Sequence, residues 1–138
     1  MLPEKFNLEI VTPEELLFTG EVHAVIVPGV EGYLGILPGH APLLTELQTG
    51  TIIHYHGSEE IHIFCSGGFL EVLEDQVSIL VNEATLADHI DIEEAKKIRE
   101  QAEKALNSLK QEVDYIETMQ IWRKALAQLE TAEKTGRT

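Results

Sequence analysis

The residues that break regular structure are confined to the first half of this chain, and this division constrains the fold more than any other feature. All five prolines lie at or before Pro42, and every glycine except Gly136 lies at or before Gly68. Neither residue occurs between Asp88 and Lys134. Because Gly and Pro mark turns and interrupt helices, the first part must turn often and the second part can form long helices. We therefore expect two domains, residues 1–88 and residues 89–138.

The first domain contains short apolar runs, several of which alternate with polar positions. Turn signals separate these runs at intervals of about ten residues, among them Pro28-Gly29, Pro38-Gly39 and Gly67-Gly68. Short strands at this spacing predict an antiparallel β-sandwich or barrel. The runs that we expect to form strands include Phe6–Ile10, Val22–Ile26, Leu34–Leu37, Thr51–Tyr55, Ile61–Cys65, Phe69–Leu73 and Val77–Val81.

The second domain is rich in Ala, Glu, Lys, Leu and Gln, which favour helix. Asp91 precedes Glu94 by three residues and Asp114 precedes Glu117 likewise, a spacing typical of helix N-termini. The second cap predicts a break near residues 107–114, and hence an antiparallel two-helix hairpin. Since no Gly or Pro forces that break, a hairpin and a more extended arrangement lie close in free energy. The expected fold class is α+β, mostly β. The apolar stripes of the two helices are Ala95, Ile98, Ala102, Ala105 and Leu109, and Ile116, Met119, Leu126 and Leu129.

The charge is distributed unevenly between the two domains. The formal net charge is −14, which argues against nucleic acid as a partner. Residues 1–88 hold 14 acidic residues and one basic residue, Lys5, whereas residues 89–138 hold 10 acidic and 9 basic residues. Helices carry Lys and Arg more readily than strands do, which explains part of the difference. A single basic residue in 88 also suggests a functional asymmetry between the domains.

Cysteine usage and hydropathy limit where the chain can act. Cys65 is the only cysteine, so no intrachain disulfide is possible, and a reducing compartment fits. No window approaches the ~18 consecutive apolar residues of a membrane span, so we expect no direct membrane insertion. The N-terminal sequence lacks the cationic and apolar regions of a signal peptide.

Three motifs identify a family. The segment Pro28–Pro42 reads PGVEGYLGILPGHAP, in which glycines and prolines punctuate a short strand. A second segment reads SGGFLEV from Ser66, and a third is Leu43-Leu44-Thr45 with Gly50 opening the next strand. On these motifs the chain resembles the ε subunits of rotary F-type ATP synthases, whose mitochondrial counterpart is called δ. The resemblance covers about residues 6–132 and implies a sandwich of about ten strands followed by two antiparallel helices.

The resemblance implies a non-catalytic rotor subunit of the central stalk. Such a subunit couples the γ subunit to the c-ring of a proton- or sodium-translocating enzyme, and its helices regulate ATP hydrolysis. It is peripheral to the cytoplasmic face of the cell inner membrane. The implied contacts with the c-ring and γ are Val30, Glu31, Gly32, Tyr33 and His40, with the turn and His40 at one rotor-facing end. The implied contacts with the catalytic α/β hexamer are Lys110, Arg123 and Lys124.

Some members of this family bind ATP between the helices through an Ile-Asp-x-x-Arg-Ala motif. The matching residues here begin at Ile90 and Asp91, but Glu94 stands in place of the arginine. Replacing a cation by an anion turns attraction for a polyphosphate into repulsion. The positions that such a site would use are Glu83, Asp91 and Lys124, and we expect poor binding of ATP and no cofactor.

Two other classes of function compete with this interpretation. One is a β-sandwich interaction module that self-associates through the helical hairpin. The other is an enzyme in which His54, His56 and His62 hold a metal across a strand hairpin, although we favour solvated strand histidines and no metal. No Ser, Cys or carboxylate stands in a known catalytic signature, so we expect no catalytic residues.

Overall fold

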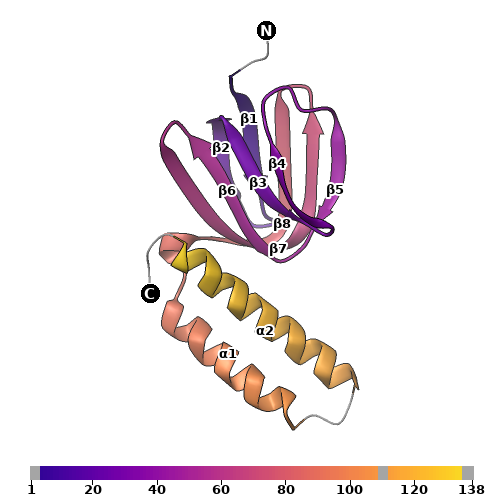
Figure 1. Cartoon of the computed structure of the whole chain (residues 1–138), viewed down its shortest axis with the longest axis vertical. Coiled ribbons are helices and arrows are strands. Elements are labelled where there is room, and N and C mark those ends of the chain that lie inside the picture. Colours follow the sequence, from indigo (N-terminus) through magenta and orange to yellow (C-terminus); the bar gives the residue numbers. More distant parts are fainter. Residues whose placement is uncertain (1–3, 109–111, 135–138) are drawn as a thin grey trace.

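The structure is a computed structural model that describes residues 4–108 and 112–134. A β-sandwich and a pair of helices lie end to end, with the helices below the sandwich in Figure 1. A short 3-10 helix, η1 (Ala87–His89), joins the two parts. The helices are α1 (Ile92–Leu106) and α2 (Glu112–Glu133). The strands are β1 (Phe6–Val11), β2 (Leu16–Val22), β3 (Ala24–Gly29), β4 (Gly32–Ile36), β5 (Leu43–Leu47), β6 (Gly50–His56), β7 (Glu59–Leu73) and β8 (Gln76–Leu86).

The strand pairing confirms the expected sandwich with one exception to its antiparallel character. The strand order is β2-β1-β8-β7-β5-β3-β4, and β6 pairs with both β3 and β7. Pairs between described strands are antiparallel except for β1 and β8, which run parallel. The described residues form 8 strands rather than about ten, because β7 and β8 are 15 and 11 residues long. The runs Ile61–Cys65 and Phe69–Leu73, which we expected to form separate strands, are therefore continuous in β7.

Strand β7 continues through Gly67-Gly68, where we expected a turn. Its first half pairs with β6 and its second half pairs with β5. A Cβ atom at Gly68 would overlap the carbonyl oxygen of Leu80 and lie 2.7 Å from the Cα of Val81. Gly68 has no positive φ, so this glycine permits the close approach of two backbones rather than a reversal of the chain.

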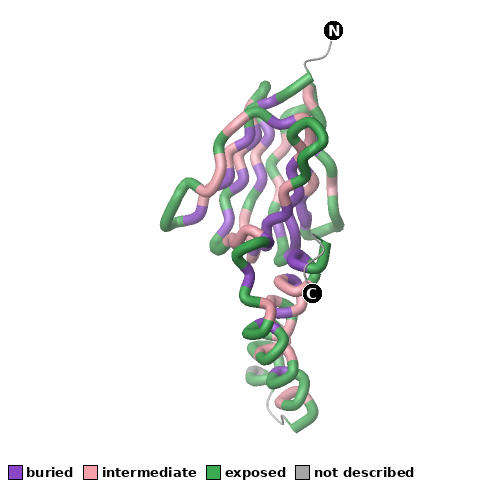
Figure 2. Tube along the Cα trace, turned by 90° about the vertical axis from the view of Figure 1, so that its left-hand side faces the viewer, coloured by how far each residue is buried: buried purple, intermediate pink, exposed green. Residues whose placement is uncertain are grey.

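The core lies inside the sandwich and is built from alternate residues of the strands. In β1, Phe6, Leu8 and Ile10 are buried, as the alternating pattern predicts. The other buried members of this cluster are Val22, Val25, Val27, Ile36, Leu47, Ile52, Ile63, Cys65, Leu70, Val72, Val77, Ile79 and Val81. All of them precede the end of β8, so the core of the sandwich uses no residue of the helices. Figure 2 shows the same concentration of buried positions in the sandwich.

The helices form the expected hairpin, with one difference in their starting points. Asp91 caps α1, and its Oδ1 accepts a hydrogen bond of 3.0 Å from the Glu94 N–H. Helix α2 begins at Glu112, so Asp114 lies inside its first turn rather than at its N-cap. Trp122 on α2 donates a hydrogen bond of 3.1 Å to Glu103 on α1, which ties the two helices together. Neither described helix is long and apolar enough to cross a membrane.

Candidate interaction surfaces

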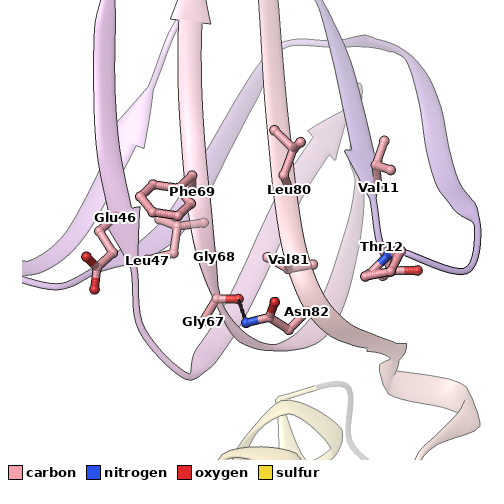
Figure 3. A pocket seen from close by; sticks show the side chains of 11 residues that line it. Val11, Thr12, Glu46, Leu47, Gly67, Gly68, Phe69, Leu80, Val81 and Asn82 are labelled. Atoms are coloured by element: carbon pink, nitrogen blue, oxygen red, sulfur yellow. Dashed lines mark hydrogen bonds between the residues drawn. The ribbon is translucent and has the colours of Figure 1, made fainter.

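An apolar surface crosses the outer side of β1, β8 and β7. Val11 pairs with Leu80, and Leu80 pairs with Phe69, so the three side chains form one row across the sheet. Phe69 and Leu80 are 52% and 51% exposed. Figure 3 shows this row beside a groove of about 620 Å³ that also includes Leu47 and Val81. We call Val11, Phe69 and Leu80, together with the exposed Leu44 on the neighbouring strand β5, the apolar face.

The apolar face was not predicted from the sequence, although a signal for it exists. Ile79-Leu80-Val81 and Phe69-Leu70 are continuous apolar runs, whereas a strand with one face in water alternates apolar and polar residues. Ile79, Val81 and Leu70 point into the core, and each is at most 3% exposed. Leu80 and Phe69, which are next to these residues in the strands, point outward, so packing in the core does not explain why they are apolar. Large apolar patches on a protein surface mark interaction sites, which is the second explanation.

The turn that connects β3 and β4 holds four of the predicted contact residues. Val30 and Tyr33 are 46% and 53% exposed, and Gly32 has φ +129°, which a side chain would disfavour. The Tyr33 hydroxyl accepts a hydrogen bond of 3.0 Å from the Thr51 N–H. The ammonium group of Lys134, just beyond α2, lies 5.8 Å from the centre of the Tyr33 ring. The turn is therefore close to the end of the sandwich where the helices dock.

His40 lies on a different part of the molecule from this turn. It is exposed in the loop after β4, and its Nδ1 lies 2.6 Å from its neighbour's carbonyl oxygen, that of Ala41. Strand β4 separates the loop from the turn, so Glu31 and His40 stand at opposite ends of that strand. We had expected both residues at one rotor-facing end of the sandwich, but the structure does not bring them together. The loop of His40 leads instead into β5, which carries Leu44 of the apolar face.

The cations of α2 have different surroundings. The Nζ of Lys124 forms an ion pair of 2.9 Å with Oε2 of Glu83 on β8, whereas Arg123 is exposed. Lys110 lies outside the described residues. A pocket of about 270 Å³ between the helices is lined by Asp91, Glu94 and Lys124, among others. Two carboxylates face one lysine in this pocket, and that lysine already has an anionic partner, so the site is poorly suited to a polyphosphate.

The three histidines considered as metal ligands lie on two faces of the sheet. Ile53 pairs with His62, so His62 points away from the face that carries His54 and His56. Burial, and then the nearby His56, lowers the pKa of His54 from 6.5 to about 4. The ring of Phe18 covers His54, with the ring centres 4.3 Å apart. Within residues 4–108 and 112–134, no three His, Cys, Asp or Glu side chains are placed to hold a metal.

The remaining candidate nucleophile is also protected. Cys65 is buried in β7, and burial raises the pKa of its thiol from 9.0 to about 12. A thiol with such a high pKa is unreactive at neutral pH. The structure thus combines a sandwich that has an exposed apolar face with a docked helical hairpin, which is the surface pattern of a protein that interacts with other chains.

Comparison with known proteins identifies the family. The model of the ATP synthase delta/epsilon chain β-sandwich domain matches residues 5–87, and that of the long α-helix domain matches residues 88–133. The ATP synthase epsilon chain of Solibacter usitatus is 43% identical over 133 residues, covering 96% of this chain and 99% of the relative. That of Desulforamulus reducens is 41% identical over 127 residues, covering 92% and 96%. The chain belongs to the ATP synthase delta/epsilon chain family.

Solved structures agree with this assignment. A chain in the cryo-EM structure of the Euglena gracilis mitochondrial ATP synthase, which includes F1 and the c-ring, superimposes with a TM-score of 0.82. The two chains are 26% identical, and the match covers 99% of this chain and 84% of the other. A chain in the central stalk and c-ring structure of the Tetrahymena thermophila enzyme has the same fold, with a TM-score of 0.65 at 13% identity.

Proposed function

We propose that this chain is a non-catalytic rotor subunit of a proton- or sodium-translocating F-type ATP synthase. It joins the γ subunit to the c-ring, and its helices regulate ATP hydrolysis by the α/β hexamer. The observation that carries this proposal is the apolar face, a surface for a permanent partner on a fold whose family belongs to that enzyme. The subunit works at the cytoplasmic face of the cell inner membrane.

The apolar face is the surface for γ in this proposal. Phe69 and Leu80 are paired across neighbouring strands and half exposed. Burying such residues against a partner contributes roughly 25 cal/mol of favourable free energy per Å² of apolar surface removed from water. The free subunit lacks this contribution. His40 belongs to the same contact, because its loop enters β5 beside Leu44. Charges around the face add selectivity, since an acidic sandwich prefers a cationic partner.

The β3–β4 turn is the surface for the c-ring in this proposal. Val30, Glu31, Gly32 and Tyr33 form a tight exposed turn between two paired strands, and such turns on rigid scaffolds are common contact sites. A cysteine introduced at Glu31 should crosslink to a cysteine in the c-ring of the assembled enzyme. Crosslinking to α or β alone would contradict this orientation of the sandwich.

The helical hairpin is the part that reaches the α/β hexamer. Arg123 and Lys124 lie side by side in α2, and Lys110 precedes that helix. These cations suit an acidic partner segment, whereas the sandwich, with its single Lys5, does not. The docked hairpin holds Lys124 against Glu83, so contact with the hexamer through Lys124 requires that ion pair to open.

A binding measurement with purified γ tests the proposal. Phe69→Ser and Leu80→Ser should each weaken binding at least tenfold, since apolar anchors at an interface contribute about 2 kcal/mol or more. Ile116→Ser is a matched control, because Ile116 is similarly exposed but lies on α2. Unchanged binding by both sandwich variants, with a folded circular dichroism spectrum, would contradict γ docking at the apolar face.

The alternative function, a module that self-associates through its hairpin, makes a different prediction. Tyr115, Ile116 and Ile121 are about half exposed on α2 and would supply the contact between copies. Size measurement of the purified chain separates the two functions. A rotor subunit is a monomer until γ is added, whereas the self-associating module is a stable dimer without γ.

A further inference from the structure

We propose that two polar contacts, one through Thr51 and Thr131 and one through Glu83 and Lys124, form a clasp that holds the hairpin on the sandwich. Helix α2 packs on β6, β7 and η1, while α1 packs chiefly on α2. The hairpin is therefore attached to the sandwich through α2, although α1 is the helix that follows the sandwich in the sequence. Release of the hairpin must break contacts made by the last turns of α2.

The first part of the clasp is a directed chain of hydroxyl groups. Thr131 Oγ1 donates a hydrogen bond of 2.8 Å to the carbonyl oxygen of Ala127 within α2. The Oγ1 atoms of Thr51 and Thr131 are 2.7 Å apart. Because the Thr131 proton is directed to Ala127, Thr51 must be the donor of the second bond. Both threonines are buried, so removing the Thr131 hydroxyl leaves the Thr51 hydroxyl without an acceptor and without water to replace it.

Small and apolar residues enclose this chain of hydroxyl groups. Thr51 pairs with Phe64 across β6 and β7, so both side chains lie on the outer side of the sheet. Phe64 is fully buried and clusters with Ile90, Ala127 and Ala132. The small side chains of α2 let its backbone come close enough for the threonine hydroxyls to meet. Undocking exposes Phe64 to water, which makes the docked state the default for the isolated chain.

The second part of the clasp is the ion pair between Glu83 and Lys124, at 2.9 Å. Both side chains are partly exposed, at 46% and 44%, so this contact is weakened by salt whereas the buried hydroxyl chain is not. Glu83 presents to Lys124 the same chemical group as an acidic partner segment would. The clasp therefore competes with any carboxylate-bearing partner for Lys124, a consequence for regulation that rests on the proposed function.

The clasp can be tested on the complete chain without any other subunit. Ser58→Cys and Gln101→Cys place fluorophores on the exposed β6–β7 turn and on exposed α1. The native Cys65 will not compete for the labels, because it is buried and its pKa is raised to about 12. Energy transfer between the labels reports docking. Trp122 fluorescence reports separately whether the two helices are still paired, since its indole bonds to α1.

Thr131→Val should raise the undocked fraction at least roughly tenfold, because it strands the Thr51 hydroxyl in a buried site. Thr131→Ser should restore docking, since serine keeps the hydroxyl chain. The matched control is Thr118→Val, which removes a similar bond of 2.8 Å to the carbonyl oxygen of Asp114 on an exposed part of α2. Trp122 fluorescence should stay unchanged in all three variants.

Salt separates the two parts of the clasp. Adding salt should increase the undocked fraction of the wild-type chain, and Glu83→Gln should remove that dependence while Arg123→Met keeps it. The proposal is wrong if Thr131→Val docks as well as the wild type, or if Thr118→Val undocks equally. It is also wrong if Glu83→Gln leaves the salt dependence unchanged. None of these results bears on γ binding, which the apolar-face variants test independently.

Discussion

Leu80 and Phe69 are direct partners across β8 and β7, and about half of each side chain is exposed on the outer side of the sandwich. Immediate neighbours in the same strands, Ile79 and Leu70, are fully buried in the core. At this pair the two strands are thus apolar on both sides, although only the inner side is covered by this chain. An uncovered apolar pair on an otherwise acidic domain indicates an interaction surface.

Substitution of Gly68 by alanine should destabilise the sandwich severely. The new Cβ would overlap the Leu80 carbonyl oxygen and approach the Val81 Cα, and both are backbone atoms that cannot move aside. We expect a loss of about 3 kcal/mol or more in the free energy of unfolding, measured by urea denaturation. Gly35→Ala is the control, because its Cβ would meet nothing within 4 Å. Equal stability of the two variants would contradict the close approach of β7 and β8.

The stability of the sandwich should fall as the pH falls from about 6.5 to 4. The pKa of His54 is about 4 in the folded chain and 6.5 when unperturbed, so in this range unfolded chains bind a proton that folded chains do not. The loss should reach about 3 kcal/mol at pH 4, on top of the contribution from other groups. His54→Leu should flatten this part of the stability profile in urea denaturation, with the exposed His40→Leu as control. A slope equal to that of the wild type would refute the assignment to His54.

ATP with magnesium should bind the isolated chain only weakly, with an affinity poorer than micromolar. Asp91 and Glu94 face the interhelical pocket, and Lys124 is already paired with Glu83. Isothermal titration is the direct measurement. Glu94→Arg should strengthen binding if charge is the cause, and Glu93→Arg on the same helix turn is the control for added charge. Micromolar binding by the wild-type chain would overturn this prediction.

Deletion of everything after Asp88 should leave a folded sandwich. The core cluster contains no helical residue, so the loss is confined to the docking site around Thr51 and Phe64. The truncated chain should still assemble, and ATP hydrolysis should rise if the hairpin inhibits it. Phe64→Ser in the truncated chain should improve its solubility, because Phe64 loses its cover. An unfolded truncation product, or unchanged hydrolysis by the assembled enzyme, would count against the proposed regulatory hairpin.

Local pattern was sufficient to predict the fold class and most of the elements of this fold, but not their three-dimensional relationships. The alternation of Phe6, Leu8 and Ile10 and the cap at Asp91 depend on neighbouring residues, and the structure confirms both. Gly67-Gly68 resembled a turn because glycine permits both a reversal of the chain and a close approach of two backbones. Only the position of β8 distinguishes them.

The candidate interaction surfaces were harder to predict, because they depend on how elements far apart in the sequence are arranged in space. The contact between Thr51 and Thr131 joins residues 80 positions apart, and no periodicity relates them. Glu31 and His40 are far apart because strand β4 lies between them. This separation is not visible when the segment Pro28–Pro42 is treated as a single motif. The family motifs predicted individual contact residues, whereas their grouping into surfaces required the structure.

Photo-crosslinking from the apolar face in the assembled ATP synthase tests the central claim most directly. A photoreactive phenylalanine analogue at position 69 should crosslink predominantly to γ, and the same analogue at Tyr115 on α2 should not give that product. Loss of the γ crosslink on adding Leu80→Ser would tie the contact to the apolar pair. Crosslinking from position 69 to α or β, or to a second copy of this chain, would contradict the account of this protein as a subunit that docks on γ through its sandwich.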